Sequence, residues 1–306
     1  MNIVHLPLNI ADYASRLAEG QRRLGHRVTV FSRPMTPYDF SCDVKLPAWH
    51  GPVFRNLALL QHWKTLRDVD IIHVHGGLWR TDVFYSLLRR VSDARLVVHY
   101  HGTEARTGKG LFWQNLANVQ FYATPDLKHW VPRGIWLPQP VSLPPLPLPP
   151  DNPKAVFIHF NPRANKGYQQ VVDVFKSAFG AIPGPVGRDS VKWVGKDAEL
   201  RVYGQIPHKQ VLEAIALADV VFDQMTTPAR GYGYIGVEGM ALGKPVLATL
   251  DRRLYPADCP VLTPRKTKLM ELARRSNYYG ELGRAYVERV HETSVVAEKA
   301  LKYTFK

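Results

Sequence analysis

The sequence alternates short apolar, β-branched segments with segments whose apolar residues recur at helical spacing, and this alternation most strongly constrains its fold. In the first half, strands are expected at residues 2–8, 27–33, 68–77 and 94–102, and helices at residues 12–26 and 78–93. Parallel neighbouring strands need a crossover connection, which helices of this length supply. The pattern therefore predicts a parallel sheet with helices on both faces.

A proline-rich stretch, "LPQPVSLPPLPLPPDNP" at residues 137–153, interrupts this alternation. Its prolines exclude a helix or an inner strand, so we expect a semi-rigid connector between two domains. The alternation then resumes, with strands expected at residues 154–160, 198–204, 220–225 and 245–250 and helices at residues 167–179, 208–219 and 236–243. The last segment, residues 277–305, is expected to be wholly helical.

We predict an α/β fold of two Rossmann-like, doubly wound domains, at residues 1–140 and 141–280, followed by a helix at residues 281–306. A chain of 306 residues, 45% of them hydrophobic, can form two separate cores. Ligands of doubly wound sheets bind at the carboxyl ends of the strands, so a ligand is expected in the cleft between the two domains.

Composition indicates the cellular compartment of the protein and the charge of its binding partners. The two cysteines, Cys42 and Cys259, are far apart in the sequence and indicate a reducing compartment rather than a disulfide framework. The first residues lack the features of a signal peptide, and no apolar run approaches the ~18 residues of a membrane span. We expect a cytoplasmic protein, at most peripheral to a membrane. The formal net charge of +14 favours anionic partners, namely nucleic acid, phospholipid or phosphate-bearing substrates.

The segment "RGYGYIGVEGMALGKPV" contains a G-x-G-x-x-G pattern at Gly231, Gly233 and Gly236. Such a pattern fits a dehydrogenase loop, a tight strand-to-helix entry, or a helix whose first amides face an anionic ligand. A dinucleotide-binding loop opens the first strand–helix unit of its domain, whereas these glycines come late in the second domain, which disfavours the dehydrogenase. In the third interpretation, Glu238 could accept hydrogen bonds from sugar or ribose hydroxyls.

Several segments, in order along the chain, resemble the retaining GT-B glycosyltransferases of the "glycosyl transferases group 1" family. The glycine segment "GYGYIGVEGMALGKPVLA" resembles the donor-binding signature of that family. The other matching segments are "GQRRLGHRVTVFSR", "DIIHVHGG", "VVHYHGTEAR", "FNPRANKGYQQVVDVF" and "IPHKQVLEAIALADVVFDQ". The resemblance covers nearly the whole chain.

The resemblance implies transfer of a sugar from a nucleotide-diphosphate-sugar, such as a UDP- or GDP-sugar, to a hydroxyl of a sugar, lipid-linked or other acceptor. Anomeric configuration is retained, and no metal or other cofactor is needed. The first domain would hold the acceptor and the second the donor. The helix at residues 281–306 would cross back onto the first domain.

The resemblance also assigns donor-side residues. Arg163 and Lys166 match the pair that clamps the donor diphosphate, where two cations stabilise the charge that develops on the leaving group. Glu238 matches the glutamate that binds the ribose. The remaining implied donor contacts are Asn9, Gly204, Ile206, Gly231, Tyr232, Gly233, Tyr234 and Ile235.

The sequence departs from the family at Arg230, where many members carry a glutamate assigned to the donor sugar or to catalysis. Asn9 lies where many members have glycines. The departure at Arg230 leaves a non-catalytic nucleotide-sugar-binding protein as an alternative. A GT-B phosphorylase or epimerase is another, and a basic nucleic-acid binder ranks last because no nucleic-acid motif is present.

The resemblance places His101 at the end of a strand near the donor sugar, as a catalytic residue beside Arg163 and Lys166. Glu104 and Arg106 follow on the same loop and would face the acceptor. The pairs "HVH" and "HYH" each place two imidazoles on one face of a strand, and such pairs could meet at neighbouring strand ends. No cysteine or carboxylate completes either pair, so we predict no metal site.

Overall fold

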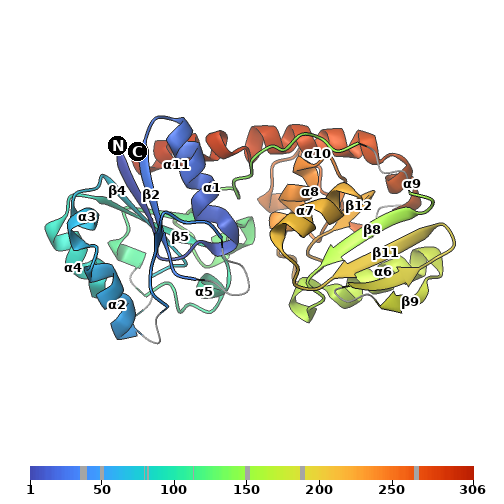
Figure 1. Cartoon of the computed structure of the whole chain (residues 1–306), viewed down its shortest axis with the longest axis horizontal. Helices are drawn as coiled ribbons and strands as arrows, with labels where there is room; N and C mark the ends of the chain where they lie inside the picture. Colours follow the sequence, from blue (N-terminus) through green and yellow to red (C-terminus); the bar gives the residue numbers. More distant parts are fainter. Residues whose placement is uncertain are drawn as a thin grey trace. The chain divides into compact units, whose positions relative to one another are not determined.

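The computed structural model describes residues 1–34, 40–48, 52–78, 80, 83–112, 114–148, 152–186, 190–264 and 269–306. The chain divides into two compact units (Figure 1). Unit 1 comprises Met1–Pro140 and Thr293–Lys306, and unit 2 comprises Val141–Glu292. Residues 281–292, which we expected in the crossing helix, therefore lie in unit 2.

Unit 1 is built on a parallel sheet with strand order β3-β2-β1-β4-β5-β6-β7. The strands are β1 (Asn2–Leu6), β2 (Arg27–Ser32), β3 (Val44–Lys45), β4 (Ile71–His75), β5 (Arg95–Tyr100), β6 (Val119–Tyr122) and β7 (Ile135–Trp136). The helices are α1 (Tyr13–Arg23), α2 (Pro52–Leu60), α3 (Trp63–Arg67), α4 (Val83–Val91), α5 (Thr103–Arg106) and α11 (Thr293–Thr304). Short 3-10 turns are η1 (Ile10–Asp12), η2 (Gln114–Leu116) and η3 (Pro125–His129). The central strands are buried almost throughout, as expected for a parallel sheet between helices.

Unit 2 contains a mixed sheet with strand order β13-β12-β8-β11-β10-β9. Its strands are β8 (Ala155–Phe160), β9 (Ile182–Val186), β10 (Ser190–Val194), β11 (Ala198–Tyr203), β12 (Val220–Phe222) and β13 (Val246–Leu247). Its helices are α6 (Tyr168–Phe179), α7 (His208–Ala216), α8 (Tyr234–Ala241), α9 (Leu269–Arg274) and α10 (Ser276–Val290), with 3-10 turns η4 (Ala164–Lys166) and η5 (Arg252–Leu254). Strands β8, β11, β12 and β13 are parallel, so their carboxyl ends meet at one edge.

The structure corrects two expectations about individual elements. The tail is not one helix, because α10 ends at Val290 and α11 begins at Thr293. Between them, the carbonyl of His291 accepts a hydrogen bond from the amide of Val141 at 2.8 Å, which ties the break to the proline-rich connector. The antiparallel strands β9 and β10 were missed, because "IPGPV" carries prolines that are tolerated only at a sheet edge.

Helix α11 packs against α1 within unit 1, where the two helices lie side by side (Figure 1). Their approach is so close that a Cβ atom at Gly20 would lie 2.3 Å from the carbonyl oxygen of Thr293. The predicted fold class of two Rossmann-like α/β units, with a C-terminal helix on the first, is confirmed. Among the described helices, none has the length and apolar character to cross a bilayer.

Candidate functional site

The glycine segment joins the end of β12 to the start of α8, and a buried carboxylate organises it. Asp223, which directly follows β12, accepts hydrogen bonds from the backbone amides of Gly233 and Gly236. These amides would otherwise lack partners, because the first turn of a helix has no intrahelical acceptors for them. A Cβ atom at Gly236 would lie 2.7 Å from the Asp223 carboxylate, so this position requires glycine. The geometry supports a tight strand-to-helix entry as the primary role of the glycines.

Lys166 lies close enough to Asp223 to affect the pKa of its carboxyl group. Burial raises the pKa of Asp223, whereas Lys166 and the two glycine amides oppose that rise. The turn that carries Lys166 follows β8, and its carbonyl accepts a hydrogen bond from the amide of Met225 at 3.2 Å. The next residue, Gly167, has a φ of +76°, and a Cβ atom there would lie 2.2 Å from the carbonyl oxygen of Met225. Backbone contacts therefore hold Lys166 against the end of β12.

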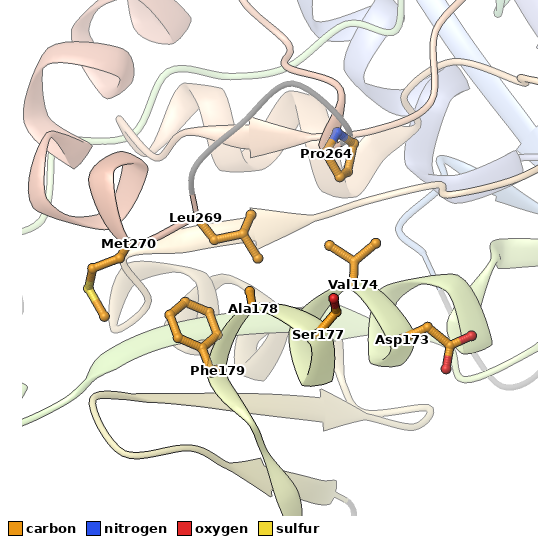
Figure 2. Close-up of a pocket in the computed structure, with 8 residues that line it drawn as sticks. All are labelled: Asp173, Val174, Ser177, Ala178, Phe179, Pro264, Leu269 and Met270. Atoms are coloured by element: carbon orange, nitrogen blue, oxygen red, sulfur yellow. The ribbon is translucent and has the colours of Figure 1, made fainter.

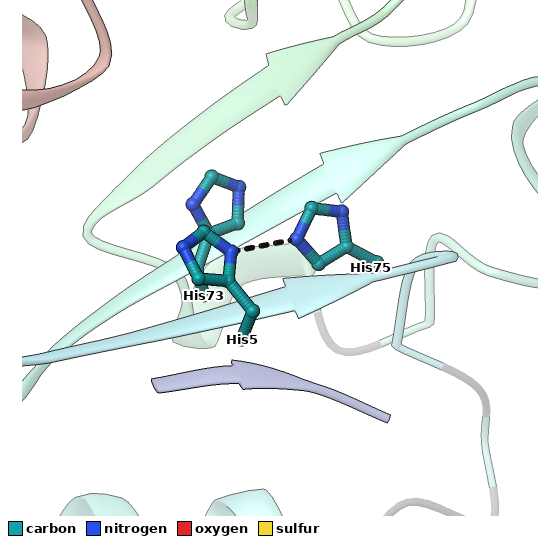
Figure 3. A group of neighbouring side chains, drawn as sticks. All are labelled: His5, His73 and His75. Atoms are coloured by element: carbon teal, nitrogen blue, oxygen red, sulfur yellow. Dashed lines mark hydrogen bonds between the residues drawn. The ribbon is translucent and has the colours of Figure 1, made fainter. Parts of the chain in front are cut away.

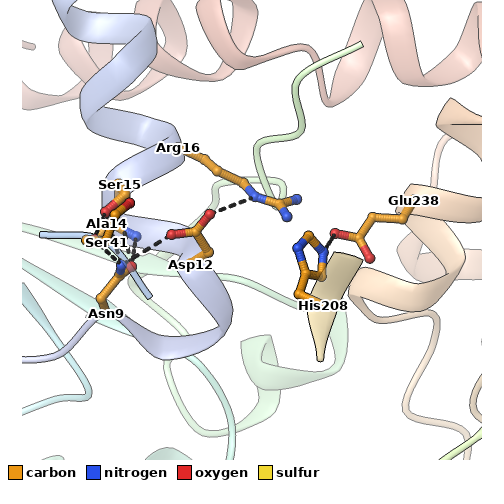
Figure 4. Close-up of polar contacts among 8 residues, drawn as sticks. All are labelled: Asn9, Asp12, Ala14, Ser15, Arg16, Ser41, His208 and Glu238. Atoms are coloured by element: carbon orange, nitrogen blue, oxygen red, sulfur yellow. Dashed lines mark hydrogen bonds and ion pairs between the residues drawn. The ribbon is translucent and has the colours of Figure 1, made fainter. Parts of the chain in front are cut away.

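Glu238 is buried in α8 and accepts a hydrogen bond from Nε2 of His208 at 2.8 Å (Figure 4). Glu238 also contributes to the electrostatic environment of Asp223. Lys166, Asp223 and Glu238 thus form one charged group at the carboxyl ends of β8 and β12. Sequence reasoning found Lys166 and Glu238 but missed Asp223 and His208, which no motif distinguished.

The other predicted donor-side residues fall into two groups. Arg163 is exposed at the start of η4, while Gly204, Tyr234 and Ile235 are partly buried. In contrast, the side chains of Tyr232 and Ile206 belong to the hydrophobic core of unit 2. The Tyr232 hydroxyl hydrogen bonds with Nε2 of His291 at 2.9 Å. Tyr232 and Ile206 can therefore reach a ligand through backbone atoms rather than side chains.

In unit 1, Asn9 is buried and its side chain is committed to the start of α1 (Figure 4). Its Oδ1 accepts from the amides of Ala14 (3.0 Å) and Ser15 (3.3 Å). Its Nδ2 donates to Asp12 Oδ1 (3.2 Å), to the Ser15 hydroxyl (2.9 Å) and to the carbonyl of Ser41 (3.1 Å). The structure therefore gives Asn9 a capping role at the carboxyl end of β1.

Glu104 and Arg106, predicted on the acceptor side, both have partners within unit 1. The Glu104 carboxylate accepts from the amides of His101 and Gly102, which shapes the loop after β5. Arg106 donates to the Asp126 carboxylate through Nε (3.1 Å) and Nη2 (2.7 Å). These contacts position the loop that carries His101.

Histidines from β1, β4 and the end of β5 form a cluster, hereafter the histidine cluster, whose members are His5, His73, His75, His99 and His101. Figure 3 shows His5, His73 and His75. Burial lowers the pKa of His5 to about 4 and that of His101 to about 3. Burial also lowers the pKa of each of the other three, with neighbouring imidazoles adding to the effect. The cluster is therefore neutral at pH 7.

The two predicted histidine pairs do meet on neighbouring strands, and His5 joins them because β1 lies beside β4. The groups His5–His73–His75 and His75–His99–His101 bring ring nitrogens within 4.8 Å of one another. However, the rings of His73 and His75 stack at an interplanar angle of 5°. Imidazole lone pairs lie in the ring plane, so stacked parallel rings cannot both direct a lone pair at one ion. This geometry disfavours one metal ion shared by His5, His73 and His75.

A hollow of about 560 Å³ lies elsewhere in unit 2, between α6 and α9 (Figure 2). Its lining is largely apolar and includes Phe179, Leu269 and Met270. Among the described residues of the lining, Asp173 alone carries a carboxylate, which accepts a hydrogen bond from Gln169 at 2.8 Å. None of the predicted site residues lines this hollow.

Comparisons with known proteins agree with the architecture. The sequence profile of the glycosyl transferase 4-like domain matches residues 10–156. A comparison with curated protein sequences finds no significant match.

Solved structures resemble all or most of the chain. An alpha-glucosyltransferase in complex with UDP-glucose and DNA containing an abasic site has a TM-score of 0.69 at 12% identity, over 100% of this chain and 98% of that chain. The complex of an alpha-glucosyltransferase with UDP and a 13-mer DNA containing an HMU base gives a TM-score of 0.68 at 13% identity, over 100% of both chains. A variant of S. aureus TarM bound to fondaparinux, alpha-GlcNAc-glycerol and UDP gives a TM-score of 0.53 at 9% identity, over 82% of this chain and 59% of that chain. The fold is therefore that of GT-B glycosyltransferases.

The neutral histidine cluster predicts a specific pH dependence of stability. The pKa of His5 is about 4 in the folded protein, below the ordinary histidine value of 6.5, so the unfolded chain binds more protons between these values. Stability is therefore fully present above pH 6.5 and is lost as the pH falls toward 4, at up to about 1.4 kcal/mol per pH unit for each such group. Denaturant unfolding from pH 7 to pH 5 should show this loss.

The variant His5→Gln should show a shallower pH dependence of the unfolding free energy than the wild type, because one titrating group is gone. The exposed histidine at position 129 provides the matched control, since His129→Gln should keep the wild-type slope. Equal slopes for His5→Gln and wild type would contradict the assignment.

Proposed function

We propose that the protein is a retaining glycosyltransferase that uses a UDP-sugar donor and needs no metal ion. The observation that carries the proposal is the charged group of Lys166, Asp223 and Glu238 at the carboxyl ends of β8 and β12 in unit 2. These two strands are parallel, and ligands of doubly wound folds bind at the carboxyl ends of such strands. The match of residues 10–156 to a glycosyl transferase profile and the UDP in structures of the same fold support the proposal.

Lys166 and Arg163 would hold the donor diphosphate. Asp223 occupies the amides of Gly233 and Gly236, so these two amides are not offered to a phosphate. Recognition of the diphosphate therefore falls to the side-chain cations, which also stabilise the negative charge that grows on the leaving group. Glu238, held by His208, would accept hydrogen bonds from the ribose hydroxyls.

In the proposed reaction, the acceptor oxygen bonds to the anomeric carbon as the bond between that carbon and the phosphate oxygen breaks. Both events occur on the same face of the sugar, which retains the anomeric configuration. The departing phosphate oxygen takes the proton of the acceptor hydroxyl. His101, on the loop after β5, would hydrogen bond a sugar hydroxyl.

The variant Lys166→Ala should weaken UDP binding by about 10- to 100-fold, the cost of one charge-assisted contact of about 1.5–3 kcal/mol. Binding of uridine, which lacks phosphates, should change little in this variant, whereas Glu238→Gln should weaken UDP and uridine alike. Isothermal titration on both variants measures this. Lys209→Ala is the control, because Lys209 is an exposed lysine of the same unit with 89% of its side chain accessible.

Equal losses of affinity for UDP and for uridine in Lys166→Ala would contradict the assignment of Lys166 to the diphosphate. UDP-sugar binding with neither sugar transfer to a hydroxyl acceptor nor hydrolysis of the donor would favour a non-catalytic protein. That result would agree with Arg230 standing where many family members carry a glutamate assigned to the donor sugar or to catalysis.

A second proposal concerns the acceptor, for which double-stranded DNA is a candidate. The net charge of +14 favours a polyanion, and two of the structures that resemble the chain over its full length contain DNA. If DNA is the acceptor, its affinity should fall by at least about tenfold between roughly 50 and 200 mM salt. Duplex DNA should also accelerate UDP release from UDP-glucose. Absence of binding at the lower salt concentration would exclude this acceptor.

A further inference from the structure

Four side chains in unit 1 form a continuous hydrogen-bonded chain. Oε1 of Gln21, on α1, lies 2.7 Å from Nε2 of His5, on β1. Nδ1 of His5 lies 2.9 Å from Nε2 of His75, on β4, the contact drawn in Figure 3. Nδ1 of His75 lies 3.0 Å from Nε2 of His101, on the loop after β5. His5 and His75 thus each use one ring nitrogen toward Gln21 and the other toward the loop.

The chain has one direction because a neutral imidazole carries one N–H and one lone pair. Gln21 Oε1 is a carbonyl oxygen and only accepts, so His5 donates through Nε2 and accepts at Nδ1. His75 must then donate through Nε2 and accept at Nδ1, and His101 must donate through Nε2. The remaining nitrogen of His101, Nδ1, carries a lone pair.

The rings are held in place by packing. Tyr13, on α1, contacts His99 and His101 edge to face, with centroid distances of 4.5 and 4.9 Å. The Tyr13 hydroxyl donates to the backbone carbonyl of Pro138 at 2.9 Å, which fixes the phenol ring. His99 stacks on His101 with centroids 4.6 Å apart. A ring flip of His101, which would exchange its two nitrogens, is therefore opposed on two sides.

We propose that Gln21, His5 and His75 are positioning residues that fix His101 in the Nε2–H tautomer, so that its Nδ1 acts as a hydrogen-bond acceptor. His101 is the only member of the histidine cluster that is partly exposed, whereas Gln21, His5 and His75 are buried. Through these hydrogen bonds, the orientation of the Gln21 side chain on α1 determines which ring nitrogen of His101 carries the proton. The inference rests on the proposed function and deepens it, because Nδ1 would accept a hydrogen bond from a sugar hydroxyl.

The assignment has a chemical consequence for the proposed site. A neutral His101 with a lone pair at Nδ1 accepts a hydrogen bond from a hydroxyl but cannot donate one there. It also supplies no positive charge. The hydrogen-bonded chain therefore gives His101 the role of binding a hydroxyl.

Long-range ¹H–¹⁵N correlation spectra of ¹⁵N-histidine-labelled protein report the tautomer of each ring and need no substrate. Signals of His101 are assigned by their loss in His101→Asn. The proposal predicts the Nε2–H tautomer at His5, His75 and His101 in the wild-type protein. An Nδ1–H tautomer at His101, or an equal mixture, would overturn it, because the chain would then run in the opposite direction or in none.

The variant Gln21→Met removes the terminal acceptor with little change in volume. It should increase the Nδ1–H fraction of His101, whereas Gln120→Met, a change of a glutamine on β6 outside the chain, should not. If sugar transfer is observed, Gln21→Met should lower kcat with a smaller change in UDP affinity. An unchanged His101 tautomer in a folded Gln21→Met variant would refute the positioning role.

The tautomer and the sugar-transfer readouts separate the two proposals. Failure of transfer with the predicted tautomers in place would refute the proposed function alone. The same spectra, recorded with elemental analysis of the purified protein, also test for a transition metal. Stoichiometric metal whose removal by chelator changes the His75 and His101 signals would overturn the hydrogen-bonded chain.

Discussion

The hydrogen bonds from the amides of Gly233 and Gly236 to the Asp223 carboxylate are the contact on which the proposed donor site depends. They join the end of β12 to the start of α8 and set the position of Glu238, one turn into that helix. Burying a carboxylate is costly unless it is paired or hydrogen bonded. Lys166 provides the nearby positive charge, so the same interaction that stabilises the loop places a cation at the sheet edge.

Unit 1 buries polar imidazole rings in the centre of a parallel sheet, where they need hydrogen-bond partners. Buried imidazoles must satisfy their N–H groups, and no single neighbour does so for the whole histidine cluster. The register of β1, β4 and β5 brings the rings into contact, and they use one another and Gln21 as partners. The arrangement is neutral, directional and ends at the partly exposed His101. A structural requirement for hydrogen bonding thereby determines the chemistry available at the loop after β5.

Periodicity predicted the strands and helices that hold both sites, because burial on a sheet or on a helix face imposes a spacing that the sequence displays. It also indicated that the histidine pairs that begin at His73 and His99 could meet. It could not find His5, whose role depends on strand order, or Asp223, whose role depends on a contact with Gly233 ten positions along the chain. Tyr232 was assigned to the ligand, yet its hydroxyl bonds to His291, a partner supplied by the far end of the unit. Likewise, the break between α10 and α11 carries a hydrogen bond to Val141, which no local sequence pattern predicts.

The central claim is that unit 2 binds a nucleoside diphosphate between the turn after β8 and the start of α8. A crystal structure with UDP tests it most directly. The account predicts the diphosphate within hydrogen-bonding distance of Lys166 and Arg163, and the ribose hydroxyls on Glu238. UDP bound elsewhere in the chain, or with its phosphates away from both cations, would contradict it.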